Sequence, residues 1–304
     1  MEKKPVLVVA LGGNALLKRG EPLEAGIQQQ NILIAAGVIA RLTDEWRVVL
    51  VHGNGPQVGL LALQNAAYSD VAPYPLDILV AESQGMVGYM LQQALRNALP
   101  SQEVTTLLTR VTVDPADPAF QDPCKYIGPV YTSVQAADLA AEKGWRIKQD
   151  GTGFRRVVPS PAPLAISESA AIHTLLQHDH LVICNGGGGI PVVQTGQTMA
   201  GCEAVIDKDL SAALLATQLQ ADALLILTDA DAVYRDWGTP SQEAIGQVTV
   251  SSLAGTRFDA GSMGPKVDAC CQFVRTCGGY AGIGSLQDGG RILSGQKGTL
   301  IIPG

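Results

Sequence analysis

A lysine enclosed by two aspartates, in Ile206-Asp207-Lys208-Asp209, is the feature of the sequence that most directly indicates chemistry. Asp207 precedes a run with helical apolar spacing and belongs to the residue types that cap helix N-termini. The positive end of the helix dipole disfavours a cation in the first turn, so Lys208 at that place indicates a bound anion such as a phosphoryl group. Asp209 beside it would fix its orientation. Lys266, after Met263-Gly264-Pro265 and before another predicted helix, is either a second such lysine or a solvated first-turn residue.

Four turns rich in glycine or small polar residues follow short apolar runs. Glycine at a strand end lets the backbone approach an anion, and a following helix start offers free N–H groups. A single glycine-rich segment of this kind, such as 186–189, could equally be an ordinary tight turn without a ligand. Four in one chain favour a phosphate-rich ligand. The turns are Leu11-Gly12-Gly13-Asn14, His52-Gly53-Asn54-Gly55-Pro56, Asn185 with residues 186–189, and Thr228-Asp229-Ala230-Asp231.

The common nucleotide and metal motifs do not fit these turns. None matches the P-loop pattern, none gives a clean G-x-G-x-x-G after a strand, and the H-R-D and D-F-G sets of protein kinases are absent from the sequence. Nucleotide binding must therefore use another glycine scheme, and a dinucleotide oxidoreductase is disfavoured. His178-x-His180 has the spacing of a metal pair, but we interpret it as a polar loop between a helix and a strand.

The elements that must position these residues alternate along the chain. Continuous, β-branched-rich runs at 6–10, 48–51, 181–184 and 224–227 predict strands buried on both faces, as in a parallel sheet covered by helices. Helical spacing predicts helices over 28–42, 83–99, 167–177 and 210–220. Strand, turn and helix in repetition predict an open α/β sheet. Ligands of such sheets bind beyond the carboxyl ends of the strands, where the four turns would converge.

Residues 113–163 depart from that alternation. This segment is punctuated by Asp114-Pro115, Asp117-Pro118, Asp122-Pro123 and Gly128-Pro129, and it contains Lys125. It predicts an excursion from the main sheet, either a lid or small subdomain or an ordinary surface insertion.

Composition bounds the possible partners. The 304 residues are 46% hydrophobic, which is ample for a buried core. A net charge of −7 with only 21 Lys and Arg argues against a nucleic-acid partner, because such binding needs a basic face. No uninterrupted apolar run reaches the roughly 18 residues of a membrane span.

The location is expected to be cytoplasmic. The apolar start at 5–11 imitates a signal peptide, but Gly12-Gly13-Asn14 interrupts it and no cleavage site follows before Lys18-Arg19. Six cysteines at irregular spacing are typical of reduced thiols, and they indicate neither a zinc site nor a disulfide framework.

Taken together, seven blocks resemble the carbamate kinases of the amino-acid-kinase superfamily, and the resemblance runs from about residue 6 to 302. The resemblance implies a three-layer α/β/α sandwich on a mainly parallel open sheet of about eight strands, with a protruding subdomain, in a homodimer. It also implies the reversible reaction of ATP with carbamate to give ADP and carbamoyl phosphate, with Mg²⁺. The blocks are 10–16, 52–59, 83–85, 155–158, 186–191, 203–209 and 261–267.

The resemblance also implies residue roles. Gly12 and Gly13, with Asn14, would hold the transferred phosphoryl group, and Gly53 and Asn54 would hold carbamate. The catalytic set would be Lys125, Lys208, Asp209 and Lys266, with Asp209 orienting the lysines. Magnesium would be held mainly by phosphates and water rather than by a protein carboxylate cage. The nucleotide would lie near Gly188, Gly189, Asp229, Ala232, Val233, Tyr234, Met263 and Gly264.

Lys125 would reach the site from the subdomain and supply the charge that related carboxylate kinases place at the position of Asn14. The family motif there is Lys-Pro-Ile-Gly, whereas this chain reads Lys125-Tyr126-Ile127-Gly128 and so loses the fixed φ of proline.

The implied organisation is a single amino-acid-kinase domain over 1–304. An acceptor-binding lobe would cover 1–190 and include the subdomain at 113–163, and a nucleotide-binding lobe would cover 191–304. The family often runs the reaction toward ATP in nitrogen catabolism. Two alternatives remain open: a superfamily kinase with another small carboxylate acceptor, and a regulator that binds nucleotide or carbamoyl phosphate without turnover. The four catalytic residues argue against the second.

Overall fold

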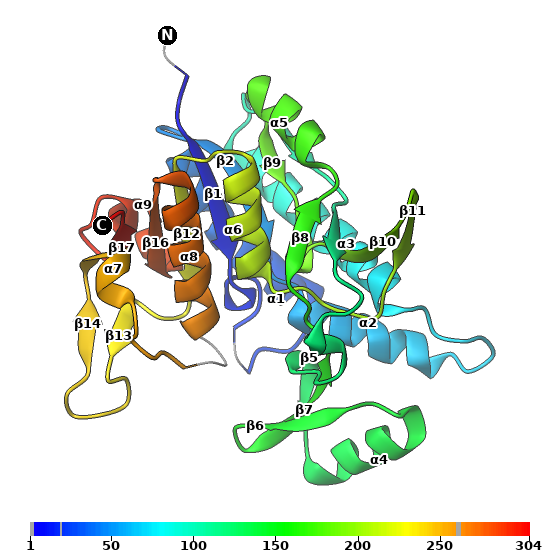
Figure 1. Ribbon diagram of the computed structural model, residues 1–304. Coiled ribbons are helices and arrows are strands. Elements are labelled where there is room, and N and C mark those ends of the chain that lie inside the picture. Colours follow the sequence, from blue (N-terminus) through cyan, green and yellow to red (C-terminus); the bar gives the residue numbers. More distant parts are fainter. Residues whose placement is uncertain (1–2, 19, 260–262) are drawn as a thin grey trace.

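The computed structural model of the protein describes residues 3–18, 20–259 and 263–304, and for Asn14 the backbone alone. Its central sheet has eight strands, and neighbouring strands are parallel except for one antiparallel pair, β16 with β17. In spatial order the strands are β15 (Gln247–Thr249), β17 (Thr299–Ile302), β16 (Tyr280–Ser285), β12 (Ala223–Thr228), β1 (Val6–Leu11), β2 (Arg47–His52), β9 (Leu181–Ile183) and β3 (Val104–Thr106). Figure 1 labels those from β17 to β9.

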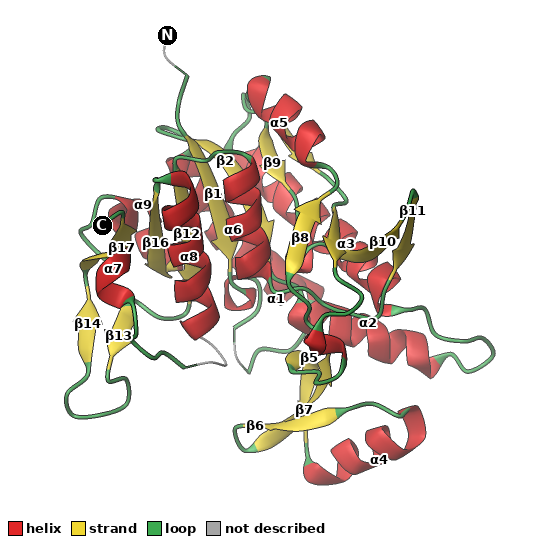
Figure 2. Ribbon diagram, viewed as in Figure 1, coloured by secondary structure: helices red, strands yellow, loops and turns green. Residues whose placement is uncertain are grey.

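Helices cover both faces of this sheet (Figure 2). Side chains alternate along a strand, so β1 sends Leu7 and Val9 into one core and Val8 and Ala10 into the other. The first core is closed by α1 (Ala25–Leu42), α3 (Leu76–Ala98) and α9 (Gly289–Leu293), and the second by α5 (Ser169–Gln177), α6 (Lys208–Gln218) and α8 (Met263–Cys277). The predicted three-layer α/β/α fold with a mainly parallel sheet is confirmed.

The predicted strands and helices all exist, with shifted ends. The largest difference is α3, which begins at Leu76 rather than at 83, because Pro75 supplies the extended residue before the first turn and Leu76 and Leu79 are buried. The sequence patterns missed α2 (Gly55–Ala67), which starts within the predicted turn at 52–56, immediately after Asn54. Pro56 at its first turn fits a helix start, where proline loses no hydrogen bond.

The parallel strands bring the predicted turns to one edge. β1, β2, β9 and β12 are adjacent and run in the same direction, so the residues that follow each of them emerge together at their carboxyl ends. Gly12 donates its N–H to Leu227 O at 2.8 Å, and Gly53 donates to Leu11 O at 3.0 Å, which ties three of the four turns to their neighbours.

Residues 113–163 are connected to the rest of the chain by two antiparallel strands, β4 (Arg110–Val113) and β8 (Pro163–Ile166), in which Val113 pairs with Pro163. They belong to a four-stranded sheet with β10 (Ile190–Thr195) and β11 (Thr198–Gly201). Beyond them lies a three-stranded sheet in the order β5 (Lys125–Tyr131), β7 (Gly153–Val158) and β6 (Ile147–Asp150), with α4 (Ser133–Lys143). Figure 1 shows this subdomain projecting from the three-layer body.

The remaining elements are short. A two-stranded ribbon of β13 (Val233–Arg235) and β14 (Glu243–Ile245) follows β12, and α7 (Val250–Leu253) follows β15. Across the described residues, no helix is long and apolar enough to cross a membrane. The six cysteines are free thiols.

Phe273 of α8 is fully buried in the core between α6, α8 and the sheet. Phe273→Ala should lower the free energy of unfolding by about 3 to 5 kcal/mol, since it removes an aromatic ring and leaves a cavity. Urea unfolding of both proteins measures this. Leu164→Ala, which truncates a side chain that is 55% exposed, is the control and should change the stability by less than about 0.5 kcal/mol. Equal effects of the two substitutions would contradict the assigned core.

Candidate active site

Asp207 caps α6, as the sequence predicts. Its Oδ1 accepts hydrogen bonds from the backbone N–H groups of Asp209 at 2.9 Å and Leu210 at 3.3 Å. These bonds satisfy two of the free N–H groups of the first turn. Lys208 is therefore held as the first residue of the helix, at the carboxyl edge of the sheet.

Asp209 lies between two lysines. Its Oδ1 accepts a hydrogen bond from Lys208 Nζ, and its Oδ2 accepts one from Lys266 Nζ at 3.1 Å. The Asp209 side chain is only 3% exposed, and those of Lys208 and Lys266 are 11% and 19% exposed. Burial lowers the pKa of Lys208, and the neighbouring Lys266 acts in the same direction, while Asp209 opposes them. The two lysines come from α6 and α8, which pack against each other.

Lys125 reaches the same place from the subdomain. Its Nζ lies 2.5 Å from Asp207 Oδ2. Burial by itself would lower the pKa of Lys125, but the Asp207 carboxylate outweighs it and the pKa is raised. Burial likewise favours the neutral acid at Asp207, yet Lys125 and then Lys208 hold the pKa of Asp207 well below its ordinary value. Both groups are therefore charged at neutral pH.

These five residues, Lys125, Asp207, Lys208, Asp209 and Lys266, are called the lysine cluster below. The three lysines against two aspartates give the cluster a net positive charge. A partly buried site with an excess of cations attracts small anions much more strongly than an exposed patch does. Within this cluster, the sequence missed Asp207 as the partner of Lys125, because their 82-residue separation leaves no local signal.

The glycine turns at 11–14 and 52–56 lie next to the lysine cluster. A Cβ added at Gly53 would lie 3.1 Å from Gly13 N and 3.6 Å from Lys208 Cδ. The backbones of Gly53 and Gly13 therefore pack together, the aliphatic stem of Lys208 lies beside Gly53, and the Gly12 N–H donates to Leu227 O. Asn14 continues this turn in a short 3₁₀ segment, Gly13–Ala15, and its side chain lies outside the described part of the chain.

Asn54 packs against the turn at 186–189. Its Nδ2 donates to Ser83 Oγ at 2.7 Å, and a Cβ at Gly187 would lie 2.1 Å from the same nitrogen. Gly187 also has φ +65°, which a glycine adopts without strain. A Cβ at Gly188 would lie 2.4 Å from Ile206 O, so this turn also contacts the residue before Asp207.

A layer of buried polar side chains supports the turns, and the sequence patterns did not predict it. Gln84 Oε1 accepts from Thr109 N at 2.9 Å, and its Nε2 donates to Gly186 O at 2.9 Å. Asn185 Nδ2 donates to Ser211 Oγ at 2.9 Å. His52, at the end of β2, is buried, which lowers its pKa to about 4, so its ring is neutral at pH 7. The sequence signal that could have revealed this layer is the presence of polar residues, such as Gln84, Asn185 and His52, within or next to apolar segments.

The nucleotide residues predicted from the resemblance fall into three groups. Met263 and Gly264 begin α8, one turn before Lys266, while Gly261 and Ser262 of that motif lie outside the described residues. Asp229 follows β12. Val233 is fully buried and Tyr234 OH donates to Asp231 Oδ1 at 3.0 Å. Gly189 closes the turn beside Val111 and Thr109.

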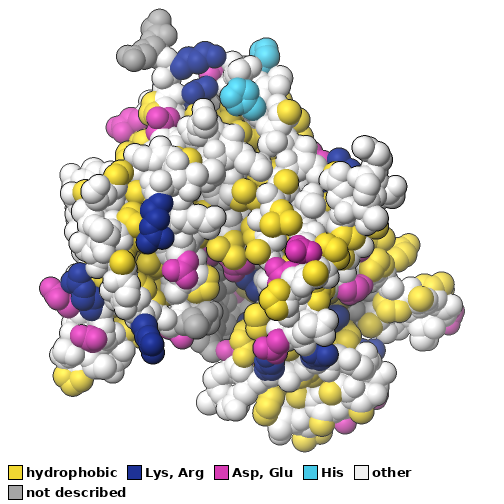
Figure 3. All heavy atoms as spheres, viewed as in Figure 1, with side chains coloured by type: hydrophobic (Ala, Val, Ile, Leu, Met, Phe, Trp, Pro, Cys, Tyr) yellow, Lys and Arg dark blue, Asp and Glu magenta, His cyan; other side chains and the backbone are white. Residues whose placement is uncertain are grey.

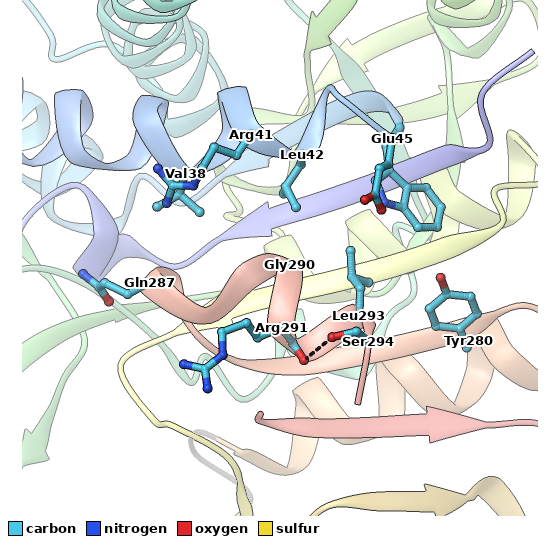
Figure 4. A pocket seen from close by; sticks show the side chains of 11 residues that line it. Val38, Arg41, Leu42, Glu45, Tyr280, Gln287, Gly290, Arg291, Leu293 and Ser294 are labelled. Carbon is cyan, nitrogen blue, oxygen red and sulfur yellow. Dashed lines mark hydrogen bonds between the residues drawn. The ribbon is translucent and has the colours of Figure 1, made fainter. Parts of the chain in front are cut away.

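Two other observations bear on the site. Within the described ranges, no group of three or more His, Cys, Asp or Glu is placed to hold a metal ion. A pocket of about 490 Å³ lies between α1 and α9 (Figure 4), lined by Arg41, Trp46, Tyr280 and Arg291 among others. The pocket extends along this face of the sheet from Tyr280, the first residue of β16, to Gln287, just beyond its last residue, and contains none of the predicted site residues.

Comparison with known proteins places this geometry in a family. The model of the amino acid kinase family matches residues 5–283. A carbamate kinase of Escherichia coli (strain K12) is 57% identical over 295 residues, which are 97% of this chain and 98% of that protein. The chain belongs to the carbamate kinases of the amino acid kinase family. The family resemblance expected from the seven sequence blocks is therefore confirmed.

Further relatives agree with this assignment. A carbamate kinase of Rhizobium meliloti is 53% identical and covers 97% of this chain and 92% of its own length. The structure of the carbamate kinase from Giardia lamblia bound to AMP-PNP superposes with a TM-score of 0.90 at 40% identity, over the whole of both chains. The carbamate kinase fold thus extends through the entire chain, including the protruding subdomain.

The ion pair of Asp207 with Lys125 yields a pH-dependent prediction. Because the pKa of Asp207 is lowered in the folded protein, the pair stabilises the fold above the unfolded pKa of about 4, and this contribution is lost as the pH falls further. Asp207→Asn keeps a capping side chain and should cost about 1 to 2 kcal/mol at pH 7. Urea unfolding at several pH values should show this difference shrinking below pH 4.

Asp207→Ala is the matched variant, since it removes the cap as well and should cost about 1 kcal/mol more at pH 7. A difference between wild type and Asp207→Asn that is the same at pH 7 and pH 3 would contradict the ion pair.

Proposed function

We propose that this protein catalyses the reversible transfer of a phosphoryl group between ATP and carbamate, giving ADP and carbamoyl phosphate. The observation that carries the proposal is the pair Lys208 and Lys266 held on one buried carboxylate, Asp209, beside the glycine turns. Two anions must approach each other in this reaction, so charge neutralisation and alignment provide most of the catalysis. The identity with carbamate kinases over nearly the whole chain supports the choice of reaction.

In the direction of carbamate phosphorylation, a carbamate oxygen forms a bond to the γ-phosphorus as the bond to the β,γ-bridging oxygen breaks. Lys208 and Lys266 are proposed to flank the phosphates, one at the transferred group and the other at the leaving β-phosphate. Gly13 would present its backbone N–H to the phosphoryl oxygens, while Gly12, whose N–H is bonded to Leu227 O, would let the backbone approach them closely. Carbamate is already an anionic nucleophile, so no general base is required. Asp209 accordingly orients the lysines and takes no proton.

The acceptor side is assigned to Gly53, Asn54 and Lys125. The contacts of Gly53 with Gly13 and Lys208 support this, because they place the two turns next to each other. Lys125 would add the positive charge for carbamate or for the transferred phosphoryl group. The acceptor-binding lobe would be residues 1–190 and the nucleotide-binding lobe 191–304, with the nucleotide near the residues listed from the resemblance.

Magnesium is proposed to enter with the nucleotide. The carboxylates of the lysine cluster are paired with lysines, and no carboxylate cage exists within the described residues. When bound, Mg²⁺ would neutralise phosphate charge, held mainly by phosphate oxygens and water.

Family membership also supports a cytoplasmic homodimer that works toward ATP formation. Figure 3 shows acidic and basic side chains interspersed on the face in view, with no basic patch suited to nucleic acid.

The proposal is tested by ATP formation from ADP, Mg²⁺ and carbamoyl phosphate in a coupled assay. Turnover in the ordinary enzyme range, about 1 to 1,000 per second, supports it. The same assay with acetyl phosphate and other acyl phosphates tests the choice of acceptor. Turnover with another acyl phosphate alone would replace carbamate by a different carboxylate, and ADP binding without any turnover would indicate a regulator.

Lys208→Ala and Lys266→Ala should each lower kcat by about three orders of magnitude, as the loss of a cationic group does in other phosphoryl-transfer sites. Steady-state ATP formation measures both variants. Lys3→Ala, which removes an exposed lysine before β1, at the amino edge of the sheet and so opposite the cluster, is the control and should match wild type. Activity of either cluster variant within tenfold of wild type would remove that lysine from the proposed mechanism.

A further inference from the structure

The strand that carries Lys125 is irregular just beyond the lysine. Along β5 and β7, Ile127 pairs with Arg156 and Tyr131 pairs with Phe154, so β5 has two more residues than β7 between these pairs. Gly128 within this bulge has φ +74°. A bulge bends a strand and re-aims neighbouring side chains. The direction of Lys125 therefore depends on what holds the bulge.

Arg155 of β7 lies opposite the bulge and binds it. Its Nε donates to Gly128 O at 3.1 Å, and its Nη1 lies 3.3 Å from Asp150 Oδ2. The guanidinium carbon is 5.7 Å from the centre of the Tyr126 ring, within cation–π range. The arginine side chain is only 20% exposed. One planar group thus fixes the carbonyl of the bulge and the ring of the residue next to Lys125.

Tyr126 makes a second connection across the small sheet. Its OH donates to Gln149 O of β6 at 2.6 Å, which links β5 to the far strand. Lys125 and Tyr126 are consecutive on β5, so their side chains point to opposite faces. The ring is therefore held on one face of the strand while Lys125 Nζ meets Asp207 on the other.

The bulge also rests on the acceptor side of the site. A Cβ added at Gly59 of α2 would lie 2.0 Å from Gly128 Cα, so the two backbones are in direct contact. Helix α2 begins immediately after Asn54. The contact at Gly128 thus fixes the position of β5, which carries Lys125, relative to the turn that is proposed to bind carbamate.

We propose that Arg155 and Tyr126 are positioning residues that set Lys125 in the active site by fixing the bulge at Gly128. The inference deepens the proposed function, on which its kinetic test rests. The guanidinium contacts no predicted substrate position and acts through the strand. In this chain the side chain of Tyr126, tied to Gln149 and Arg155, restrains a position where the related motif has proline.

Arg155→Met keeps the aliphatic stem and removes the guanidinium. In ATP formation it should lower kcat about tenfold to hundredfold, the effect of a misplaced catalytic group, and leave the KM for ADP within about twofold. Tyr126→Phe removes one hydroxyl and should lower kcat by about threefold. The control is Lys148→Met, which removes a cation from the neighbouring strand β6, where Lys148 pairs with Asp122, and should match wild type.

The decisive kinetic comparison is made in the absence of Lys125. If Arg155 acts through Lys125, the variant with both Lys125→Ala and Arg155→Met should be no slower than Lys125→Ala by more than about twofold. Multiplicative losses in the double variant would overturn the proposal. So would a change in the KM for ADP that exceeds the change in kcat, or a kcat of Arg155→Met equal to that of wild type.

A measurement without turnover separates this inference from the proposed function. Lys125 is labelled with an amine-reactive ester and its rate of modification is followed by peptide mass spectrometry, with Lys297 as the internal reference. The ion pair with Asp207 should protect Lys125 in wild type, and Arg155→Met should raise its labelling rate several-fold. An unchanged rate contradicts the positioning role even if the enzyme is active. Inactive wild type with faster labelling in the variant contradicts the proposed function alone.

Discussion

A single buried carboxylate between two ammonium groups is the constraint on which the site depends. Lys208 and Lys266 repel each other, and burial disfavours the charged form of Lys208. Asp209 offsets both effects because each of its oxygens accepts a hydrogen bond from one lysine. The carboxylate is nearly inaccessible, so its attraction for the lysines is screened little by water. A phosphate that enters the site meets two cations already set in place.

The fold supplies this constraint from distant parts of the chain. Asp209 and Lys208 begin α6, Lys266 lies in the first turns of α8, and the two helices pack on the same face of the sheet. The parallel strands bring the glycine turns to the edge where α6 begins. The subdomain adds Lys125 through Asp207, which also caps α6. One helix start thus joins the proposed nucleotide side, the proposed acceptor side and the subdomain.

The features of the fold and the site that depend on local sequence pattern could be predicted. Continuous apolar runs predict the buried parallel strands, and residue type at a helix start predicts the Asp207 cap and the unusual place of Lys208. The resemblance added the family, which is confirmed, and the roles that are proposed for the lysines. What the sequence missed depends on long-range packing: the pairing of Lys125 with Asp207, and the polar layer around Gln84 and Asn185. The bulge held by Arg155 likewise depends on the register of two antiparallel strands, which no local spacing reveals.

The measurement that tests the central claim most directly is the rate of ATP formation by Asp209→Asn, with ADP, Mg²⁺ and carbamoyl phosphate as substrates. The amide keeps the size of the side chain but loses the charge that holds Lys208 and Lys266 together. The account predicts that kcat falls at least about a hundredfold while the KM for ADP changes less than about fivefold. A kcat within tenfold of wild type would contradict the claim that this carboxylate organises the site.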